Sequence, residues 1–404
     1  MEESGKPKSF FQPGMIPKEE TLDREKKGRQ IVIGLLKESD VHETRVPLTP
    51  QGVGMLIDGG HRVLIERGAG EGARFSDKDY SEEGGELVDS RTAINEASIL
   101  IKVSPLIKSE VQLLSQGKTI LSSLQLATRD DTYFQELIRR KVTAIAFELI
   151  RDEVQEMPVL RAMCEIAGTE AVIIGSSLLG SENNGKGILL GGVTGITPSE
   201  VVILGADTAG ENAARTAIGM GATVKVFDQS IPRLRALKHN VGRELFTSVM
   251  HPPVLKKAFE TADLVISTLQ RLDQESFFLV PEDMVLSMKR GSVIIDIHVD
   301  QGSSFETGIY TTPDQPVFQK HGVLHYMVPN LPAKVARTAS IALSNVLMPI
   351  LLDKGRCGGI LQLIKEDRGV RQGIYLYNGI LTNELIGNQF GIPSNDIDLL
   401  LSAF

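Results

Sequence analysis

Apolar residues recur along the chain in short runs separated by longer mixed segments. The early runs are IVIGLL, HRVLIE, SILIKV, TILSSL and TAIAFE, at 31–36, 61–66, 98–103, 119–124 and 143–148. Their length and their content of Val, Ile and Thr are typical of strands, and segments of helical length separate several of them. This alternation predicts βαβ units that build a mostly parallel sheet.

A second series of apolar runs begins near the middle of the chain. A helix is expected near 159–180, and a Gly-rich segment, GKGILLGGVTG, follows it. The next runs of strand length are SEVVILGA, TVKVFD, DLVIST, SVIIDIHVD and GVLHYMV. From about Ala339 the pattern predicts long helices only. The prediction is therefore an α/β protein with two mostly parallel sheets.

Composition and charge narrow the class of function. The 404 residues are 42% hydrophobic, enough for two cores of ordinary domain size. The formal net charge of −8, from 43 basic and 51 acidic residues, attracts neither nucleic acid nor an anionic membrane. No N-terminal apolar segment is typical of a signal peptide, and no stretch approaches the ~18 apolar residues of a membrane span. We expect a cytoplasmic protein with small-molecule chemistry, no nucleic-acid partner and no membrane partner.

The two cysteines predict no metal centre. Cys164 and Cys357 lie far apart in the sequence and have no partner His or Cys at metal-ligand spacing. We interpret both as small apolar residues rather than reactive thiols, and we expect no bound metal.

The densest chemical signal lies at 199–228. The run SEVVILGA leads into Gly205, Ala206, Asp207 and Gly210, then into the helical segment ENAARTAIGMGA and the run TVKVF, which ends at Asp228. This order matches a dinucleotide-binding fingerprint in its strand–turn–helix–strand context, and the acidic residue is placed to bond a ribose hydroxyl.

Asp207 departs from that fingerprint, because the second glycine of the pattern is expected there. A carboxylate facing the pyrophosphate would repel it by roughly 4 kcal/mol at about 4 Å and an effective dielectric near 20. Alternatively, Asp207 turns away and caps the following helix. The sequence leaves both interpretations open.

Several segments in order resemble the alanine dehydrogenases over roughly residues 30–350. They are IGLLKESDVHETRVPLTP, HRVLIERGAGEGARFSDKDY, LIKV, VVILGADTAGENAARTAIGMGATVKVFD, DIHVDQGSSFE and VPNLPAKVARTASIALSNVLMP. The related soluble subunit of proton-translocating transhydrogenase shares the fold, but DQGSSFE and NLPA with ALSNVLMP resemble the dehydrogenase branch more closely.

The resemblance implies two Rossmann-like domains, with the cofactor domain inserted in the substrate domain. The implied boundaries are an N-terminal extension at 1–30, a substrate domain at 31–158 and 337–404, and an NAD-binding domain at 159–336. The resemblance also implies a hexamer, NAD as the cofactor, and a small amino acid with its 2-oxo acid as substrates.

Individual residues carry implied roles. Arg45 and Lys102 match the cationic pair that holds the substrate carboxylate, for which Arg and Lys are chemically suited. Asp300 matches the catalytic carboxylate. The cofactor positions are Gly205, Ala206, Asp207, Gly210, Asp228, Arg233 and Asn330.

Departures from the family pattern cluster at functional positions. The family's catalytic histidine falls on Gln125, whose amide can donate a hydrogen bond but cannot transfer a proton near neutral pH. Further replacements are Cys164, Met250, Leu331 and the segment LQRLDQES. One compensation is a histidine elsewhere: on an extended strand His298 would share a face with Asp296 and Asp300, close enough to take over proton transfer.

Three functional hypotheses follow. The first is an NAD-dependent alanine-dehydrogenase-like enzyme with Gln125, His298 and Asp300 at the catalytic centre. The second is a non-catalytic homologue that keeps a carboxylate pocket and has a weakened nucleotide site. The third is a hydride-transfer module similar to the transhydrogenase soluble subunit, which would need a membrane partner.

Overall fold

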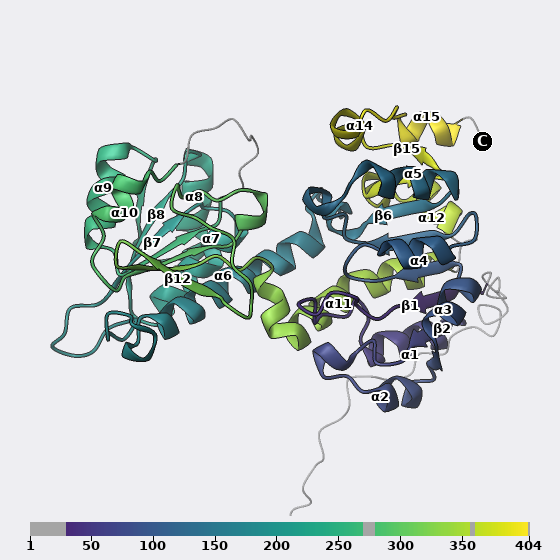
Figure 1. Ribbon diagram of the computed structural model, residues 1–404, viewed down its shortest axis with the longest axis horizontal. Coiled ribbons are helices and arrows are strands. Elements are labelled where there is room, and N and C mark those ends of the chain that lie inside the picture. The colour runs from purple at the N-terminus through teal and green to yellow at the C-terminus, as the bar shows by residue number, and fades with distance from the viewer. Residues whose placement is uncertain (1–29, 270–278, 356–359, 403–404) are drawn as a thin grey trace, which may run out of the picture.

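The computed structural model describes residues 30–269, 279–355 and 360–402, which form two lobes, each built on one sheet (Figure 1). The strand order is β15-β14-β6-β5-β4-β1-β2-β3 in the first sheet and β12-β13-β11-β10-β7-β8-β9 in the second. The predicted α/β class with two mostly parallel sheets is confirmed. Residues 1–29 of the expected extension, Cys357 and residues 270–276 of LQRLDQES lie outside the described residues.

The first sheet is parallel from β6 to β3. Its strands are β1 (Val32–Leu35), β2 (Arg62–Glu66), β3 (Glu86–Val88), β4 (Ile99–Ile101), β5 (Thr119–Ser122), β6 (Thr143–Ala146), β14 (Ile374–Tyr377) and β15 (Ile380–Leu381). Its early helices are α1 (Pro50–Asp58), α2 (Asp77–Glu82), α3 (Ser90–Glu96), α4 (Lys108–Leu113) and α5 (Asp131–Arg139). All five predicted runs in this part form strands, and β3 was not predicted.

The expectation that only helices follow Ala339 is wrong. The helices α11 (Ala336–Gly355), α12 (Ile360–Glu366), α13 (Arg368–Gln372), α14 (Glu384–Phe390) and α15 (Ile397–Ser402) are interrupted by the hairpin β14–β15. Asn378 and Gly379 form its turn at φ +49° and +79°. Asn-Gly between two apolar runs favours a tight hairpin turn, because both positions need positive φ. The hairpin extends the first sheet antiparallel to β6.

The second sheet lies between β6 and β14 in the sequence and contains the predicted fingerprint. Its strands are β7 (Glu200–Leu204), β8 (Thr223–Phe227), β9 (Phe246–Ser248), β10 (Leu264–Ser267), β11 (Val293–Asp296), β12 (Val317–Lys320) and β13 (Val323–Tyr326). Its helices are α7 (Thr208–Gly219), α8 (Ile231–Val241), α9 (Pro252–Thr261) and α10 (Glu282–Leu286). The strands of the second sheet are parallel to their neighbours, except the edge strand β12, which pairs antiparallel with β13.

Two long helices connect the lobes. Figure 1 shows α6 (Pro158–Leu178) running from the first lobe to the second and α11 returning. Gly168 of α6 lies against α7 so closely that a Cβ there would stand 2.1 Å from the carbonyl oxygen of Ala209. The helix α6 is thereby fixed against the start of the fingerprint. The predicted residue boundaries of the two domains stay a prediction.

One described helical stretch, Leu331–Leu352, is long and apolar enough to cross a membrane, with a mean hydropathy of 1.6. The expectation that no stretch approaches this length and composition is therefore wrong. Leu343 and Leu347 of this stretch are buried in the first lobe's core, where the inner helix of a globular fold has the same composition.

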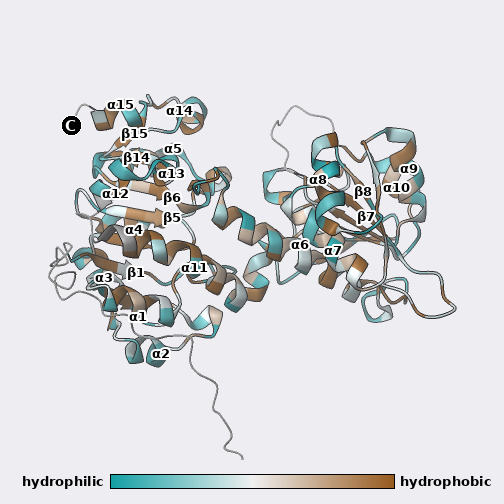
Figure 2. Cartoon of the chain, turned by 180° about the vertical axis from the view of Figure 1, so that it is seen from behind, coloured by the Kyte–Doolittle hydropathy of each residue, from teal (hydrophilic) through white to brown (hydrophobic). Residues whose placement is uncertain are grey.

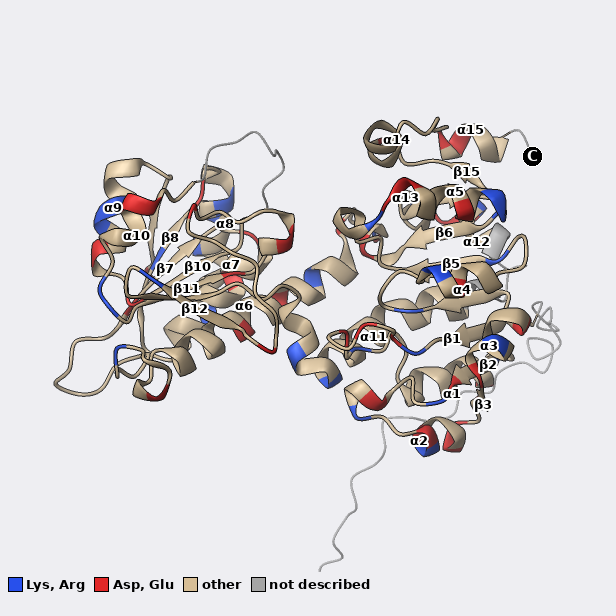
Figure 3. Ribbon diagram, in the orientation of Figure 1, with Lys and Arg blue, Asp and Glu red and all other residues tan. Residues whose placement is uncertain are grey.

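Apolar side chains line both sheets, and charges lie outside them. Figure 2 shows the strands as largely hydrophobic, in line with the buried cores on each face of the two sheets. Basic and acidic residues are interspersed over both lobes (Figure 3). No face of the described chain in that view carries one sign of charge alone.

Candidate active site

Each sheet has a topological switch point, and the region at the carboxyl ends of the strands there is called its crevice. In the first sheet the chain proceeds from β1 to β2 and β3 on one side and places β4 on the other side of β1. In the second sheet β8 and β9 lie on one side of β7, and β10 lies on the other. Loops that leave such neighbouring strands diverge, and ligands of open α/β sheets bind in the resulting crevice.

The loop after β1 brings Arg45 into the first crevice and is held there by α11. The backbone N–H of Val46 donates to Ser340 Oγ at 2.8 Å, and that of Thr49 donates to Ser344 Oγ at 3.1 Å. Both serines are buried in α11. The Thr49 side chain then caps α1. A helix from the far end of the sequence therefore fixes the loop.

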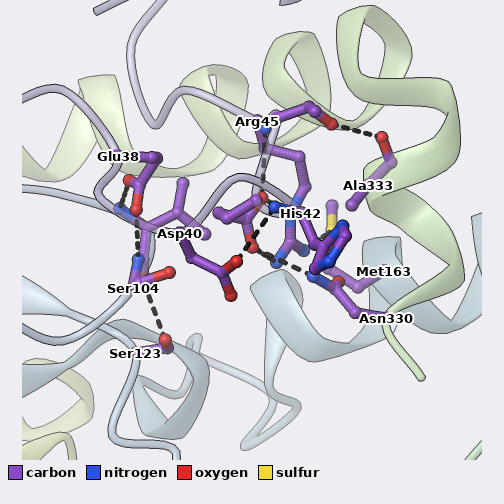
Figure 4. Close-up of polar contacts among 12 residues, drawn as sticks. Glu38, Asp40, His42, Arg45, Ser104, Ser123, Met163, Asn330 and Ala333 are labelled. Atoms are coloured by element: carbon purple, nitrogen blue, oxygen red, sulfur yellow. Dashed lines mark hydrogen bonds and ion pairs between the residues drawn. The ribbon is translucent and has the colours of Figure 1, made fainter. Parts of the chain in front are cut away.

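Arg45 is buried and already has an acidic partner (Figure 4). Its Nε and Nη2 donate to the two oxygens of Glu43 at 2.8 and 2.6 Å, and Nη1 lies 3.4 Å from the sulfur of Met163. Burial raises the pKa of Glu43, but Arg45 and Asn330 together outweigh burial and hold it below its usual value. Nη1 therefore donates to a thioether sulfur, which is a weak acceptor.

Asn330 does not extend into the second crevice in this structure. Its Nδ2 donates to Glu43 Oε2 at 3.0 Å, and its backbone has φ +57°. The neighbouring Thr44 Oγ1 donates to the carbonyl of Ala333, in the turn η7 (Leu331–Val335), at 2.5 Å. The residue predicted to contact cofactor therefore links the second lobe to the loop that carries Arg45.

Lys102 follows β4 and is almost fully buried. Its Nζ lies 2.8 and 3.0 Å from the carboxylate oxygens of Glu110, in α4, and 2.8 Å from Ser39 Oγ. The ion pair with Glu110 removes the cost of burying a lone ammonium. The predicted cationic pair is thus at the β1–β4 switch point, and each cation has its own carboxylate.

Glu38 lies on the loop after β1 that also carries Arg45, and it points toward Ser104 (Figure 4). Its oxygens accept from the backbone N–H groups of Val103 and Ser104 at 2.6 and 3.2 Å. Burial, with a smaller contribution from Glu43, raises the pKa of Glu38 to about 8, although Lys102 opposes the shift. The crevice therefore contains a carboxyl group that holds a proton at neutral pH.

Gln125 lies on the neighbouring strand end, after β5. It is exposed, with the left-handed φ of +45°, and it precedes the turn η3 (Leu126–Thr128). Beside it, Glu148 of the turn η4 (Phe147–Leu149) accepts from the N–H of Leu124 at 2.7 Å. Burial raises the pKa of Glu148.

In the second crevice Asp207 is a helix cap. Its Oδ1 accepts from the N–H of Gly210 and from Thr268 Oγ1, each at 2.9 Å. Thr268 follows β10, so the carboxylate bridges the two strands of the switch point. The capping interpretation is confirmed, and the cap also puts a carboxylate at the helix N-terminus where a phosphate would bind.

The rest of the fingerprint has the expected shape. Gly205 has φ +111°, and a Cβ there would stand 2.2 Å from Thr268 Oγ1. A Cβ on Gly210 would stand 2.1 Å from the carbonyl of Gly205. Asp228 is buried and accepts from the N–H groups of Ala206 and Ser230 at 2.8 and 2.7 Å, so it fixes the turn and marks the ribose end of the site.

A dinucleotide therefore fits the site only in part. The ribose end, at Asp228, has the required acceptor in the required place. At the phosphate end the N–H of Gly210 is occupied by Asp207, so bound pyrophosphate requires that this side chain rotate away.

Other predicted positions are more peripheral. Arg233 is exposed on the first turn of α8. Leu331 is buried in a core of the second lobe, against which Cys164 packs, and Met250 packs against the core on the other face. Burial, then the Asp207 charge, raises the pKa of Cys164 to about 12, so its thiol is protonated at neutral pH.

His298 and Asp300 do not share a strand face. The strand β11 ends at Asp296, and Val299–Gln301 form the turn η6, so the expected alternation along an extended strand is wrong. His298 Nε2 is nevertheless buried without a hydrogen-bond partner, and burial lowers the pKa of His298 although Asp207 and Asp300 oppose the shift. Asp300 is exposed.

Sequence reasoning missed the acidic residues of the first crevice. Glu38, Glu43, Glu110 and Glu148 were not singled out, although they surround the predicted cations. A signal was present for Glu148, because it is the charged last residue of an otherwise apolar run, as Asp228 is in KVFD.

Two mostly parallel sheets with switch points, one of them carrying a Gly-rich turn and a helix N-terminus, are the features of a dinucleotide-binding α/β fold. Comparison with known proteins narrows this class. The N-terminal and C-terminal domains of the alanine dehydrogenase/PNT family match residues 34–167 and 171–384.

Relatives that match most of this chain are alanine dehydrogenases as well. The chain is 38% identical over 362 residues to an alanine dehydrogenase of Bacillus subtilis, covering 89% of this chain and 95% of the relative. It is 37% identical over 365 residues to an alanine dehydrogenase of Methanococcus maripaludis, covering 90% and 97%. A solved L-alanine dehydrogenase superposes with a TM-score of 0.84 at 34% identity, covering 89% of this chain and 99% of that chain. The chain therefore belongs to the alanine dehydrogenase/PNT family and is an alanine-dehydrogenase-like oxidoreductase.

A transhydrogenase from Sinorhizobium meliloti shares the fold at a TM-score of 0.75 and 22% identity, covering 88% of this chain and 99% of that chain.

Proposed function

We propose that this protein catalyses the reversible NAD-dependent oxidative deamination of L-alanine to pyruvate and ammonia. The observation that carries the proposal is the placement of Arg45 and Lys102, both buried, at the β1–β4 switch point of a family member. A cationic pair in a crevice suits a small 2-oxo or 2-amino carboxylate.

Arg45 and Lys102 would share the substrate carboxylate. Glu43 already fixes the guanidinium plane, so a ligand oxygen meets the Nη1 edge in a preset orientation. Lys102 can exchange its bond to Ser39 for a bond to the ligand and keep its pairing with Glu110.

NAD would supply the hydride acceptor in the oxidative direction. Gly205, Ala206 and Gly210 would let the backbone approach it, and Asp228 would bond its ribose. Arg233 would lie near its adenosine end. Asn330 Nδ2 would leave Glu43 and donate to the cofactor instead. Asp207 would have to leave the Gly210 N–H, which lowers affinity by the free energy of that displacement.

The proton chemistry needs a group other than Gln125. Asp300 and His298, on the loop after β11, are the groups that the sequence offers for this role. The lowered pKa of His298 favours the neutral ring, which can accept or donate one hydrogen bond but holds a second proton poorly.

Steady-state assay of NADH oxidation with pyruvate and ammonia tests the proposal. We expect turnover that depends on all three reactants and is lost in Lys102→Met. Arg91→Met, which removes an exposed cation on α3, is the matched control and should retain the wild-type rate. Absence of turnover in the wild type, with folding intact, would overturn the proposed function.

One observation favours a second candidate. Asp207 closes the phosphate end of the second crevice through Gly210 and Thr268, as expected for a homologue that binds carboxylates without turnover. Calorimetric titration with NADH separates the two candidates. Micromolar binding supports the enzyme, and no binding alongside a thermal shift with pyruvate supports the non-catalytic homologue.

Assembly and location are part of the proposal. We infer a hexamer from the family resemblance, and a cytoplasmic location from the low cysteine content of two residues, which fits a reducing compartment. Sedimentation of the purified full chain would test the hexamer, and a monomer at micromolar concentration would contradict it.

A further inference from the structure

Four adjacent strands of the first sheet are followed by polar or charged side chains. Arg45 follows β1, Lys102 follows β4, Gln125 follows β5 and Glu148 follows β6. The pairing of Ser122 with Ala146 puts the ends of β5 and β6 side by side. Glu148 therefore follows the strand next to β5, and it accepts from the N–H of Leu124, the residue before Gln125, where the family's histidine is replaced.

Glu148 has one oxygen engaged and one without a partner. Its Oε1 accepts from the N–H of Leu124 at 2.7 Å, whereas Oε2 is buried and has no hydrogen-bond partner. A buried carboxyl oxygen without a partner is costly, so such an atom in a ligand crevice marks a contact that a ligand completes.

The charges of the crevice leave Glu148 without a cation of its own. Glu43 pairs with Arg45 and Glu110 pairs with Lys102, each at 2.6–2.8 Å. Glu38 and Glu148 remain. Both oxygens of Glu38 accept backbone N–H groups, so Glu148 is the unpaired acid with an oxygen to spare.

The groups that face Glu148 favour a retained proton. Arg45, from the loop after β1, lowers its pKa only slightly against the effect of burial. On the side of β14 stands Tyr375, whose pKa is raised well above its ordinary value by burial, then by Tyr133 of α5 and by the Glu148 charge. Burial also raises the pKa of Tyr133, so both tyrosines are neutral and add no charge beside Glu148.

We propose that Glu148 is the proton-carrying group of this site and supplies the acid–base function that Gln125 lacks. The proposal rests on the proposed function. In the reductive direction the O–H bond at Glu148 Oε2 breaks, its electron pair stays on oxygen, and an N–H bond forms at the substrate amine. In the oxidative direction the Glu148 carboxylate takes that proton back from the substrate ammonium, whose electron pair stays on nitrogen. No electrons are transferred in this step.

Glu148→Gln tests the proposal with little disturbance of the fold, because the amide oxygen can still accept from the N–H of Leu124. We expect kcat/KM to fall by ~10²- to 10⁴-fold, the usual contribution of a general acid or base. The limb of the pH profile that reports this group should disappear. Gln125→His in the Glu148→Gln background should restore part of the rate.

Glu170→Gln is the matched control. Glu170 is a buried glutamate of α6 whose pKa is also raised by burial, and its partner is Lys334, outside the described crevice contacts. It should retain the wild-type pH profile. An unchanged pH profile and rate in Glu148→Gln would overturn the proposal.

A readout without turnover separates this inference from the proposed function. Infrared spectra of the ligand-free protein over a pH series should show a protonated carboxyl signal that Glu148→Gln removes. If the wild type shows that signal but no alanine or pyruvate turnover, the proposed function fails and the protonated state of Glu148 stands. If Glu148→Gln removes no such signal at any pH, Glu148 is not the proton carrier.

Discussion

The two crevices arise from the same topology but are filled in opposite ways. At the β1–β4 switch point, cations reach the crevice and each meets an internal carboxylate, Arg45 with Glu43 and Lys102 with Glu110. At the β7–β10 switch point, the helix N-terminus meets an internal carboxylate, Asp207. The first arrangement orients cations for an incoming anion. The second puts an anion of the protein where an incoming anion would bind.

The two crevices differ in which polar atoms their carboxylates leave without a strong hydrogen-bond partner. In the first crevice the pairing leaves Arg45 Nη1 facing only a thioether sulfur, and Glu148 Oε2 with no partner. In the second crevice Asp207 accepts two hydrogen bonds and completes the cap of α7. The same topology therefore gives one crevice whose cations are already paired and oriented, and one whose helix N-terminus is already capped by a carboxylate.

Removing a cation from the first crevice should have the largest effect on stability and on pyruvate binding. Lys102→Met leaves Glu110 buried without its cation, so the free energy of unfolding should fall by about 3–5 kcal/mol. The thermal shift with pyruvate should vanish as well. Chemical unfolding and thermal melts with and without pyruvate measure both.

The double variant Lys102→Met/Glu110→Gln separates stability from binding. It should recover much of the stability, since no lone charge remains, but not the pyruvate shift. A pyruvate shift that persists in Lys102→Met would show that the cationic pair does not hold the substrate carboxylate.

Removing the Asp207 carboxylate from the second crevice should have the next largest effect, an increase in NADH affinity. Asp207→Gly removes a carboxylate from the phosphate end, and repulsion of roughly 4 kcal/mol at about 4 Å corresponds to two to three orders of magnitude in NADH affinity. Calorimetric titration measures it. Turnover need not follow, because Gln125 still lacks a titratable proton.

Asp207→Asn is the control for the cap. Its amide oxygen can still accept from Gly210 and Thr268, so α7 should remain capped while the charge is gone. NADH affinity should rise here too. Micromolar binding by the parent protein that neither variant changes would show that Asp207 acts as a helix cap alone.

Asp296, at the end of β11 in the second sheet, is another buried carboxyl with a raised pKa. Burial raises the pKa of Asp296 from 3.8 to about 6, although Ser304 and Ser303 donate to it. The folded state therefore binds the proton more tightly than the unfolded state. Stability from this group is present below pH ~4 and is lost as pH rises to ~6, by about 3 kcal/mol.

Asp296→Asn should remove that loss. The free energy of unfolding of the variant, relative to the wild type, should increase by up to about 3 kcal/mol between pH 4 and pH 7. A constant offset from the changed hydrogen bonds to Ser303 and Ser304 is expected and does not affect the test. A difference that is flat with pH would contradict the raised pKa of Asp296.

The parts of the fold that follow from local pattern were predictable from the sequence. Apolar runs located both parallel sheets, and the fingerprint at Gly205–Asp228 formed in its expected context. The β14–β15 hairpin was also signalled, by Asn378-Gly379, but the surrounding helical pattern hid it. The short edge strands β3, β9 and β12 have few buried positions and therefore left little pattern.

The chemistry of the site was less predictable because it depends on partners distant in sequence. The orientation of Asp207 is fixed by Thr268, which only the strand order brings next to it. The burial of Arg45 and Lys102 implied acidic partners, yet nothing local identified Glu43 and Glu110 among many acidic residues. His298 was placed on a strand that in fact ends at Asp296, because an apolar run does not show where its last backbone pairing lies.

The smallest expected effect concerns cofactor choice at the one end of the second crevice that already fits a dinucleotide. Asp228 is buried, and its carboxylate is fixed by Ala206 and Ser230, so it cannot turn away from a 2′-phosphate as Asp207 can from pyrophosphate. NADH should bind roughly tenfold or more tightly than NADPH, about 1.4 kcal/mol or more. Asp228→Asn should narrow that ratio by removing the charge, and Asp207→Gly should raise both affinities and leave the ratio unchanged. Tighter binding of NADPH than NADH in the wild type would show that Asp228 holds the turn without selecting the ribose.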